Sequence, residues 1–278
     1  GDGIDLLMTK NAVITNNTIE TNTSNIAFRG IFSGSSQGST LIEKNKIYTQ
    51  NDGLGIGMDE YYGGNYRLTD STRIFNNFIS VGGTDAGTSG INLVLKYKQI
   101  KVFNNSVYNR NSSANSISFY TQNQNTNTKT EVLNNVFYNK FTAIPVYVYK
   151  SAEAPADNYI QHHNLLFTNG GIYGKVQNFV DIYNSPVTTY ATLAALAASG
   201  IDYSSVSGNP LFISDKDLHA DGGILNNAGT YEASLTDDID NDSRNTATPD
   251  IGADEFNGAP LAGTVTLGTN TIAAGNIT

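Results

Sequence analysis

The chain has 278 residues and a formal net charge of −9 at pH 7, and only 15% of its residues are charged. This acidic balance argues against binding nucleic acid through a basic face. Hydrophobic residues make up 39% of the chain, enough for a sizeable core, and the absence of cysteine excludes disulfides and thiolate metal sites.

The chain begins with Gly1-Asp2-Gly3-Ile4, which has neither an initiator Met nor a signal-peptide pattern. The segment 4–7 already has the character of a strand inside a domain. We therefore expect the sequence to be a piece of a longer protein. Since no stretch approaches the roughly 20 apolar residues of a membrane helix, we expect no membrane span in this window.

A short pattern recurs along the first two thirds of the chain: an apolar residue, two further residues, Asn, one residue and a second apolar residue. The copies lie at 14–19, 42–47, 74–79, 102–107 and 132–137, with a looser sixth copy at 161–166. Successive copies are separated by 28 to 32 residues. Such regular spacing indicates a repeat architecture.

A second apolar segment lies between successive copies and alternates with a period of two, as in Ile91, Leu93 and Leu95. Each repeat therefore holds about three short strands, which is too little chain for helical crossovers but enough for one coil of a solenoid. The sequence predicts an all-β, parallel β-helix of about six or more rungs over residues 1–183. The general preference of crossovers predicts a right-handed coil.

The recurrent Asn lies between two strands, where the chain bends into the next face. This position favours left-handed backbone geometry and a side chain that bonds nearby backbone. Stacked from rung to rung, these side chains are expected to form an inward ladder. The predicted structural ladder consists of Asn17, Asn45, Asn77, Asn105, Asn135 and Asn164.

Residues 184–256 are expected to form the last rungs and a C-terminal cap. Within them, the Ala-rich segment 189–199 predicts a short helix, with Thr188 or Thr189 as N-cap and Gly200 as the stop. Its expected role is to cover or flank the open end of the β-helix. Residues 257–278, rich in Gly, Thr and Ala, are interpreted as a linker or the start of a following β domain.

The C-terminal third carries several short motifs. They are Asn-Pro-Leu-Phe at 209–212, Asp-Leu-His at 217–219, Asp-Ile-Asp-Asn-Asp-Ser-Arg at 238–244 and Pro-Asp-Ile-Gly-Ala-Asp-Glu-Phe at 249–256. With the Asn rungs, this region resembles right-handed parallel β-helix repeat proteins exported by bacteria of the Bacteroidetes group. The resemblance implies a large, multidomain protein that is secreted or surface-anchored, often through the type IX system. It also implies that a few relatives are polysaccharide lyases or glycoside hydrolases.

The acidic residues Asp238, Asp240 and Asp242 alternate as in the first half of a calcium loop, so calcium is a possible cofactor. The match is incomplete because Ser and Arg follow where an EF-hand has Gly. The alternative is a capping turn in which Arg244 pairs with Asp250 or Glu255 through its bidentate fork.

An inter-strand segment carries several tyrosines next to charged groups and could stack and hydrogen-bond a sugar. The candidate ligand-binding residues are Asp59, Glu60, Tyr61, Tyr62, Tyr66 and Arg67. The alternative is ordinary loop packing over the rod. Acids in the segment 52–60 are also candidates for glycoside hydrolysis, which needs two carboxylates across a groove, but no catalytic motif is present.

The three histidines give little indication of catalysis. His162 and His163 fall at the sixth copy, where a ladder variant or an exposed pair is the simpler interpretation than a metal site. His219 lies in the Asp-Leu-His motif, where the resemblance implies a strand, and is interpreted as structural.

Two functional hypotheses follow. In the first, this is a non-catalytic module of a secreted or cell-surface bacterial protein that binds glycans, mediates adhesion or acts as a rigid spacer. In the second, it is a lyase or glycoside hydrolase with a groove along one sheet face. Expected partners are polysaccharides or cell-surface glycans, other domains of the same chain and secretion machinery, with no nucleic acid.

Overall fold

The computed structural model describes residues 1–21, 28–60, 71–95, 99–123, 129–153, 158–180, 185–220 and 223–256. These residues form a parallel β-solenoid followed by a cap, which confirms the predicted fold class. Of the predicted ligand-binding residues, Tyr61, Tyr62, Tyr66 and Arg67 lie outside the described residues, and so does the predicted linker 257–278.

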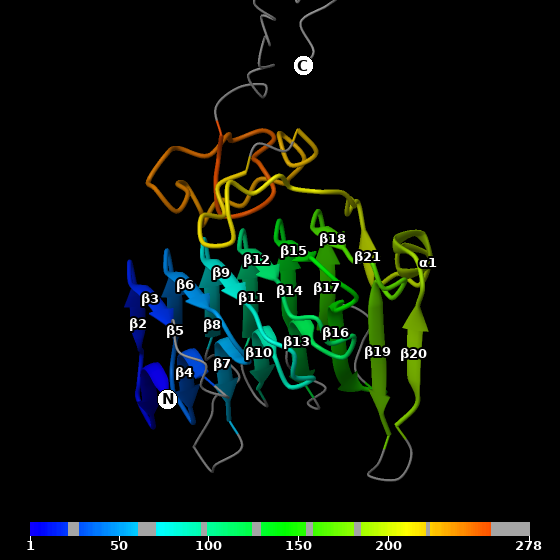
Figure 1. Ribbon diagram of the computed structural model, residues 1–278, viewed down its shortest axis with the longest axis horizontal. Coiled ribbons are helices and arrows are strands. Elements are labelled where there is room, and N and C mark those ends of the chain that lie inside the picture. Colours follow the sequence, from blue (N-terminus) through cyan, green and yellow to red (C-terminus); the bar gives the residue numbers. More distant parts are fainter. Residues whose placement is uncertain are drawn as a thin grey trace, which may run out of the picture.

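Three sheets form the sides of the solenoid, and each sheet stacks equivalent strands from successive coils (Figure 1). Sheet 1 contains, in stacking order, β1 (Asp2–Leu7), β4 (Phe28–Gly34), β7 (Gly53–Asp59), β10 (Ser89–Val94), β13 (Ile117–Asn123), β16 (Ile144–Ser151), β19 (Gly174–Phe179) and β20 (Val187–Tyr190). Sheet 2 contains β2 (Val13–Thr15), β5 (Thr40–Glu43), β8 (Ser71–Phe75), β11 (Gln99–Phe103), β14 (Thr130–Leu133), β17 (Tyr159–His162) and β21 (Asp202–Tyr203). Sheet 3 contains β3 (Thr18–Thr21), β6 (Lys46–Thr49), β9 (Phe78–Val81), β12 (Ser106–Asn109), β15 (Val136–Asn139) and β18 (Leu165–Phe167).

The strand pairs within these sheets are parallel, except that β20 returns antiparallel to β19. The six predicted copies of the Asn pattern correspond to the six stacked strands of sheet 3, which are separated by five turns. Since like strands stack on like strands, every repeat contributes the same side chains to the same row of the core.

Rows of β-branched and aromatic side chains fill the interior. In sheet 1, one row consists of Ile31, Ile56, Ile91, Phe119 and Val146, each no more than 1% exposed. Equivalent rows come from sheets 2 and 3 and meet this one in a single cluster. Burial of these rows is the main stabilising contribution to the solenoid, because each fully buried side chain of this size contributes about 2 kcal/mol.

In the turn between sheets 2 and 3, the predicted position of the left-handed residue is wrong by one residue. The left-handed residue is the one before the recurrent Asn, with φ between 51° and 58°: Asn16, Lys44, Asn76, Asn104, Asn134 and His163. Because this residue makes the bend, its side chain points outward while the next side chain points into the interior. Asn is favoured here because its short polar side chain tolerates the left-handed region.

The inward Asn residues form a continuous ladder. Nδ2 of each one donates to Oδ1 of the Asn in the following coil, at 2.8 to 3.0 Å for the five successive pairs from Asn17 to Asn164. Nδ2 also donates to backbone carbonyl oxygens, as in Asn105 to the oxygens of Ile74 and Phe103. The polar groups of these buried amides are therefore satisfied inside the core.

One helix, α1 (Leu193–Ala198), is present among the described residues, and it is shorter than the predicted segment 189–199. The preceding residues up to Tyr190 form β20 instead, and Thr192 is the N-cap, accepting from the backbone N–H of Ala195. Leu196 of the helix is 1% exposed and packs onto the solenoid core. The helix therefore shields the apolar interior at the C-terminal end of the rod.

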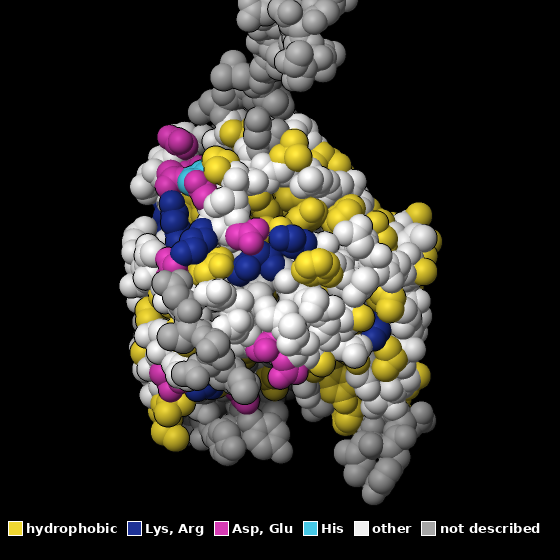
Figure 2. Space-filling model, viewed as in Figure 1, with side chains coloured by type: hydrophobic (Ala, Val, Ile, Leu, Met, Phe, Trp, Pro, Cys, Tyr) yellow, Lys and Arg dark blue, Asp and Glu magenta, His cyan; other side chains and the backbone are white. Residues whose placement is uncertain are grey.

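Residues 209–256, called the cap below, lie along one side of the rod (Figure 1). Leu235 packs against Phe75 and Phe103 of sheet 2, while Leu218 and Ile239 join the cluster of Phe78. Figure 2 shows basic and acidic side chains gathered beside each other on this face. The ion pairs Lys44–Asp237, Lys46–Asp240 and Arg110–Asp215 join the rod to the cap.

The outward left-handed residues hold the cap in place. Asn76 Nδ2 donates to the carbonyl oxygen of Asp237, and Asn104 Nδ2 donates to that of Gly252. Asn134 donates to the carbonyl oxygen of Thr230 at 2.8 Å and accepts from its N–H at 2.9 Å. The paired Asn-Asn motif thus has two tasks, since its first residue binds the cap and its second residue forms the internal ladder.

Candidate functional site

An open groove crosses the outer face of sheet 1 near its first strands. Its volume is about 540 Å³. The polar side chains that line it include Asp2, Arg29, Asp52, Asp85 and Asn92, and Leu54 adds apolar surface. Because these residues come from several successive coils, the groove depends on the stacking of the solenoid.

Arg29 is fixed at one side of the groove. Its Nε and Nη2 donate to the two carboxylate oxygens of Asp2 at 2.6 and 2.8 Å, and its guanidinium carbon lies 3.7 Å from the centre of the Phe32 ring. The hydrogen bonds from Arg29 lower the pKa of Asp2 below its ordinary value. Since the guanidinium is already neutralised by Asp2, little positive charge is left to attract an anion.

Asp52 organises a second part of the groove lining. Its Oδ1 accepts from the backbone N–H groups of Thr84 and Asp85, both at 2.6 Å, and from Asn111 Nδ2 at 3.1 Å. A carboxylate oxygen with several donors is held in place as an acceptor. Asp52 therefore shapes the loop that carries Asp85 and Thr88.

The groove continues into aromatic surface on the same face of sheet 1. Asn92 is in register with Tyr120, and Tyr120 is in register with Tyr147 on the next strand. The two tyrosine rings meet edge to face at 5.5 Å, and their hydroxyls donate to Gln122 and Gln177. These outward positions alternate with the buried row of Phe119 and Val146, so amide and aromatic groups form a strip along the rod.

The predicted ligand-binding segment starts at the other end of β7 from this groove. Asp59 is the last residue of that strand and is partly buried, and Glu60 is 1% exposed. Leu54, which lines the groove, is the second residue of the same strand. The structure therefore does not bring Asp59 and Glu60 into the groove, and the remaining residues of that prediction lie outside the described residues.

The acidic triplet of the cap divides into one buried and two exposed side chains. Asp238 is fully buried, and its carboxylate accepts from the backbone N–H groups of Asp240, Asp242 and Glu255, each at 2.9 Å. Asp240 and Asp242 are exposed. The Asp238 carboxylate is thus used to fold the turn, and calcium binding by this triplet stays a prediction.

A buried ion pair lies behind this turn. Arg244 Nη1 is 3.1 Å from Glu255 Oε2, and both side chains are at most 5% exposed. Arg244 Nη2 also donates to Asn76 Oδ1 on the rod, at 2.8 Å. Of the two partners that the sequence proposes for Arg244, the pair forms with Glu255, and Asp250 instead accepts backbone N–H groups of Asn227 and Phe256.

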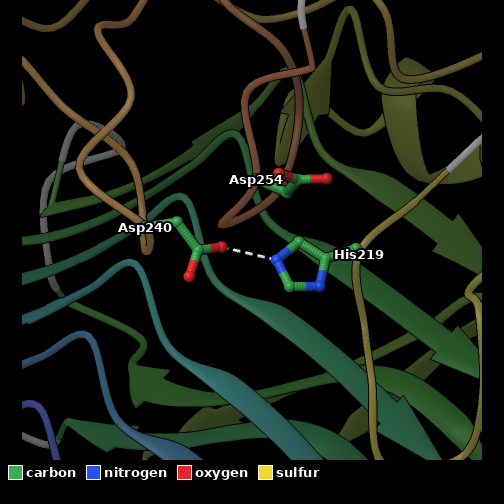
Figure 3. Close-up of side chains that lie close together, drawn as sticks. All are labelled: His219, Asp240 and Asp254. Carbon is green, nitrogen blue, oxygen red and sulfur yellow. Dashed lines mark hydrogen bonds and ion pairs between the residues drawn. The ribbon is translucent and has the colours of Figure 1, made fainter.

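His219 is surrounded by acidic groups (Figure 3). Its Nε2 lies 2.5 Å from Asp240 Oδ2, and its Nδ1 is in contact with Asp217 Oδ1. Burial opposes protonation of the ring, but the hydrogen bonds to Asp240 and Asp217 outweigh it and raise the pKa of His219. One ligand atom from each of His219, Asp240 and Asp254 lies within 4.8 Å of the others, a grouping that sequence reasoning did not find.

The other two histidines lie together on the surface of the rod. Their Nδ1 atoms are 2.8 Å apart, and the ring of Tyr203 stacks on His162 with centroids 4.4 Å apart. Burial, with the neighbouring His163, lowers the pKa of His162 to about 4. His162 lies in an outward row of sheet 2 and His163 occupies the left-handed position, so the inward ladder continues through Asn164.

Asp202 is a buried carboxylate at the C-terminal end of the core. It is 1% exposed and lies in register with Gln161, at the end of the row that includes Val132. Burial raises the pKa of Asp202 to about 7, although Ser205 donates a hydrogen bond to it at 2.6 Å. Because Asp202 does not line the groove, its raised pKa is expected to affect the stability of the fold and not ligand binding.

No protein-family model matches the sequence, and no curated protein or solved structure matches it. Among the residues that the structure describes, none of the helical segments is long and apolar enough to span a membrane.

Proposed function

We propose that this protein is a glycan-binding β-helix module whose ligand lies along the outer face of sheet 1. The observation that carries the proposal is the open groove of about 540 Å³ that leads, through Asn92, to Tyr120 and Tyr147. Amide and carboxylate groups can bond sugar hydroxyls, and tyrosine rings offer apolar contact to the faces of sugar rings.

The spacing of the site suits a polymer. Neighbouring strands of a sheet are separated by about 4.8 Å, a distance comparable to the length of one pyranose unit. A glycan that runs along the rod can therefore meet a new strand with each successive sugar. Weak contacts repeated in this way add up to useful affinity through multivalency.

The charges favour a neutral glycan. Among the described lining residues, Asp2, Asp52 and Asp85 are acidic. The Arg29 side chain, a cation in the same lining, is already paired with Asp2. An acidic polysaccharide would meet net repulsion here and would have to displace Asp2 from Arg29.

The carboxylates of the groove are used as structural acceptors, which favours binding over hydrolysis. Glycoside hydrolysis requires a carboxylic acid that can give a proton to the leaving oxygen. Asp2 and Asp52 are instead held by hydrogen-bond donors. A binding module is therefore the better account of these contacts.

We further propose that the module belongs to a secreted or cell-surface protein of the Bacteroidetes type. The motifs of the cap support this assignment, and so does a glycan ligand, which an exported protein would encounter. Fractionation of a native host with an antibody to this module would test the location, and recovery in the cytoplasm would contradict it.

The test of the binding function is a panel of neutral and acidic polysaccharides, with affinity measured by co-sedimentation or calorimetry. We expect saturable binding to at least one neutral glycan and a loss of affinity in Asn92→Ala. The same mixtures are assayed for reducing ends and unsaturated sugars. Release of products would show that the protein is an enzyme and not a binding module. Unchanged binding in Asn92→Ala would show that the ligand does not bind in this groove.

A further inference from the structure

The His219 cluster joins three separate segments of the cap. Asp217 and His219 belong to one segment, Asp240 to a second and Asp254 to a third. In Figure 3 the imidazole faces Asp240 on one side, while Asp254 lies beside the ring. Three side chains from distant positions thus present a nitrogen and two carboxylate oxygens to a common space.

The hydrogen bonds around the ring resemble those of a metal-binding histidine. A histidine that binds a metal through one nitrogen usually donates the N–H of the other to a carboxylate, which fixes the tautomer and the ring orientation. Here Nδ1 is in contact with Asp217, and Nε2 faces Asp240 Oδ2 at 2.5 Å. Asp217 is therefore placed to hold the Nδ1 proton, and a metal ion at Nε2 would replace the proton that Nε2 shares with Asp240.

We propose that His219, Asp240 and Asp254 bind a divalent transition-metal ion, with Zn²⁺ as the best fit, and that Asp217 orients His219. Imidazole nitrogen and carboxylate oxygen are ordinary zinc ligands, and three protein ligands with a water complete a tetrahedral site. Calcium is less suited to this set because it takes six to eight oxygen ligands. This inference is independent of glycan binding.

The neighbouring groups leave the site open to an ion. His219 and Asp240 keep 29% and 40% of their side-chain surface exposed, so an ion can enter from solvent. The other oxygen of Asp240 is paired with Lys46 at 3.1 Å, and Asp254 Oδ2 accepts from the N–H of Ala220 at 3.3 Å. These contacts restrict both carboxylates, which lowers the entropy lost when they bind a metal.

The bound ion would join three segments of the cap at a point where the cap contacts the rod. The ring of His219 meets Phe78 of β9 edge to face at 4.9 Å, and Asp240 contacts Lys46 of β6. A metal that links three cap segments at this point stabilises the folded arrangement by mass action, because the unfolded chain has no such site.

The test uses the whole chain after treatment with a chelator, with Zn²⁺ added during calorimetric titration and thermal unfolding. We expect one zinc ion to bind saturably. We expect the melting temperature to rise by about 5 °C or more once free zinc exceeds its dissociation constant a hundredfold. Ca²⁺ is expected to bind more weakly, and His219→Gln and Asp254→Asn should each lose the zinc effect.

The matched control is the double variant His162→Gln/His163→Gln, which removes the other two imidazoles and should keep full zinc binding. Asp217→Asn should weaken binding by about 10- to 100-fold without abolishing it. A ¹⁵N spectrum of the three histidines should show the zinc shift at His219 Nε2. Three outcomes would overturn the proposal. Zinc binding could be absent from the native chain, it could be lost in the control variant, or it could be retained in both His219→Gln and Asp254→Asn.

Discussion

Asn105 and Asn135 lie one turn apart in the core of the solenoid, and Nδ2 of Asn105 donates to Oδ1 of Asn135 at 2.9 Å. The backbone N–H of Asn105 donates to the same oxygen at 3.0 Å. A single amide oxygen in one coil thus satisfies two donors of the preceding coil. The ladder fixes the vertical register of the coils by polar contacts, inside a core otherwise filled by rows of apolar residues.

Asn105→Ala should lower the free energy of unfolding by on the order of 3 kcal/mol, because it removes several buried hydrogen bonds to Ile74, Asn77 and Asn135. The control is Asn17→Ala, at the partly exposed end of the same ladder, where water can replace the lost contacts. Urea denaturation of both variants measures the difference. Equal losses would show that burial of the ladder does not decide its contribution.

Arg244→Met should loosen the cap, because it leaves the Glu255 carboxylate buried and without its cation. Breaking a buried ion pair in this way costs about 3 to 5 kcal/mol. The double variant Arg244→Met/Glu255→Gln should recover part of that loss, since the uncompensated charge is gone. Hydrogen exchange of the amides in 235–256 measures the opening of the cap.

The control for the Arg244 variants is Lys129→Ala. Lys129 pairs with Glu131 at 3.0 Å but keeps 40% of its side-chain surface exposed, so about 0 to 1 kcal/mol is expected. If the cap amides exchange as slowly in Arg244→Met as in the native chain, the buried ion pair does not hold the cap.

Asp202 should make the solenoid less stable as the pH rises. Its pKa is about 7 in the folded protein and near the ordinary value of 3.8 in the unfolded chain, so folding favours the protonated acid. The stability that this acid contributes is complete below pH 4 and is lost as the pH rises through 7. The full effect amounts to at most about 4 kcal/mol.

Asp202→Asn should therefore stabilise the protein at pH 8 and change little at pH 4, because the amide keeps the acceptor that Ser205 uses. Denaturant unfolding at a series of pH values gives the difference between the variant and the native chain. The matched control is Glu153→Gln, in the exposed turn after β16. A constant difference across pH for Asp202→Asn would contradict the assignment.

Tyr147→Ala should weaken glycan binding about fivefold if the aromatic strip of sheet 1 contacts the ligand, since stacking contacts of this kind contribute about 1 kcal/mol. Tyr231→Ala is the matched control, because Tyr231 is an exposed tyrosine of the cap. Affinity for the best polysaccharide of the panel measures both. An equal loss in the two variants would place the contact elsewhere or indicate a general effect on folding.

The repeat made the architecture predictable from sequence. A period of 28 to 32 residues with three apolar segments leaves few alternatives to stacked coils, and the inward position of Asn105 follows from its place between two apolar residues. From the sequence, the left-handed bend was expected at the recurrent Asn, whereas the structure places it one residue earlier. Both residues are Asn in several copies, so composition at the two positions is the same while their backbone angles differ.

The groove and the His219 cluster were less accessible to sequence reasoning. Asn92, Tyr120 and Tyr147 become neighbours through strand register, which depends on the lengths of the intervening loops. The cap has little periodic structure, so nothing in its sequence places Asp254 beside His219. The alternating acids at 238–242 include Asp240 of the cluster, but burial of Asp238 separates its side chain from that of Asp240.

The cap contacts the outward residue of four successive turns, at positions 44, 76, 104 and 134. A repeat array without such a brace can gain or lose a unit in the middle, and its neighbours simply close the gap. Here an extra coil between Asn76 and Asn104 would move one set of docking points by a strand spacing of about 4.8 Å relative to a segment of fixed length. The cap thus fixes the number of coils between its contact points. Coils can be added to this rod only outside the segment that the cap contacts, or together with a longer cap.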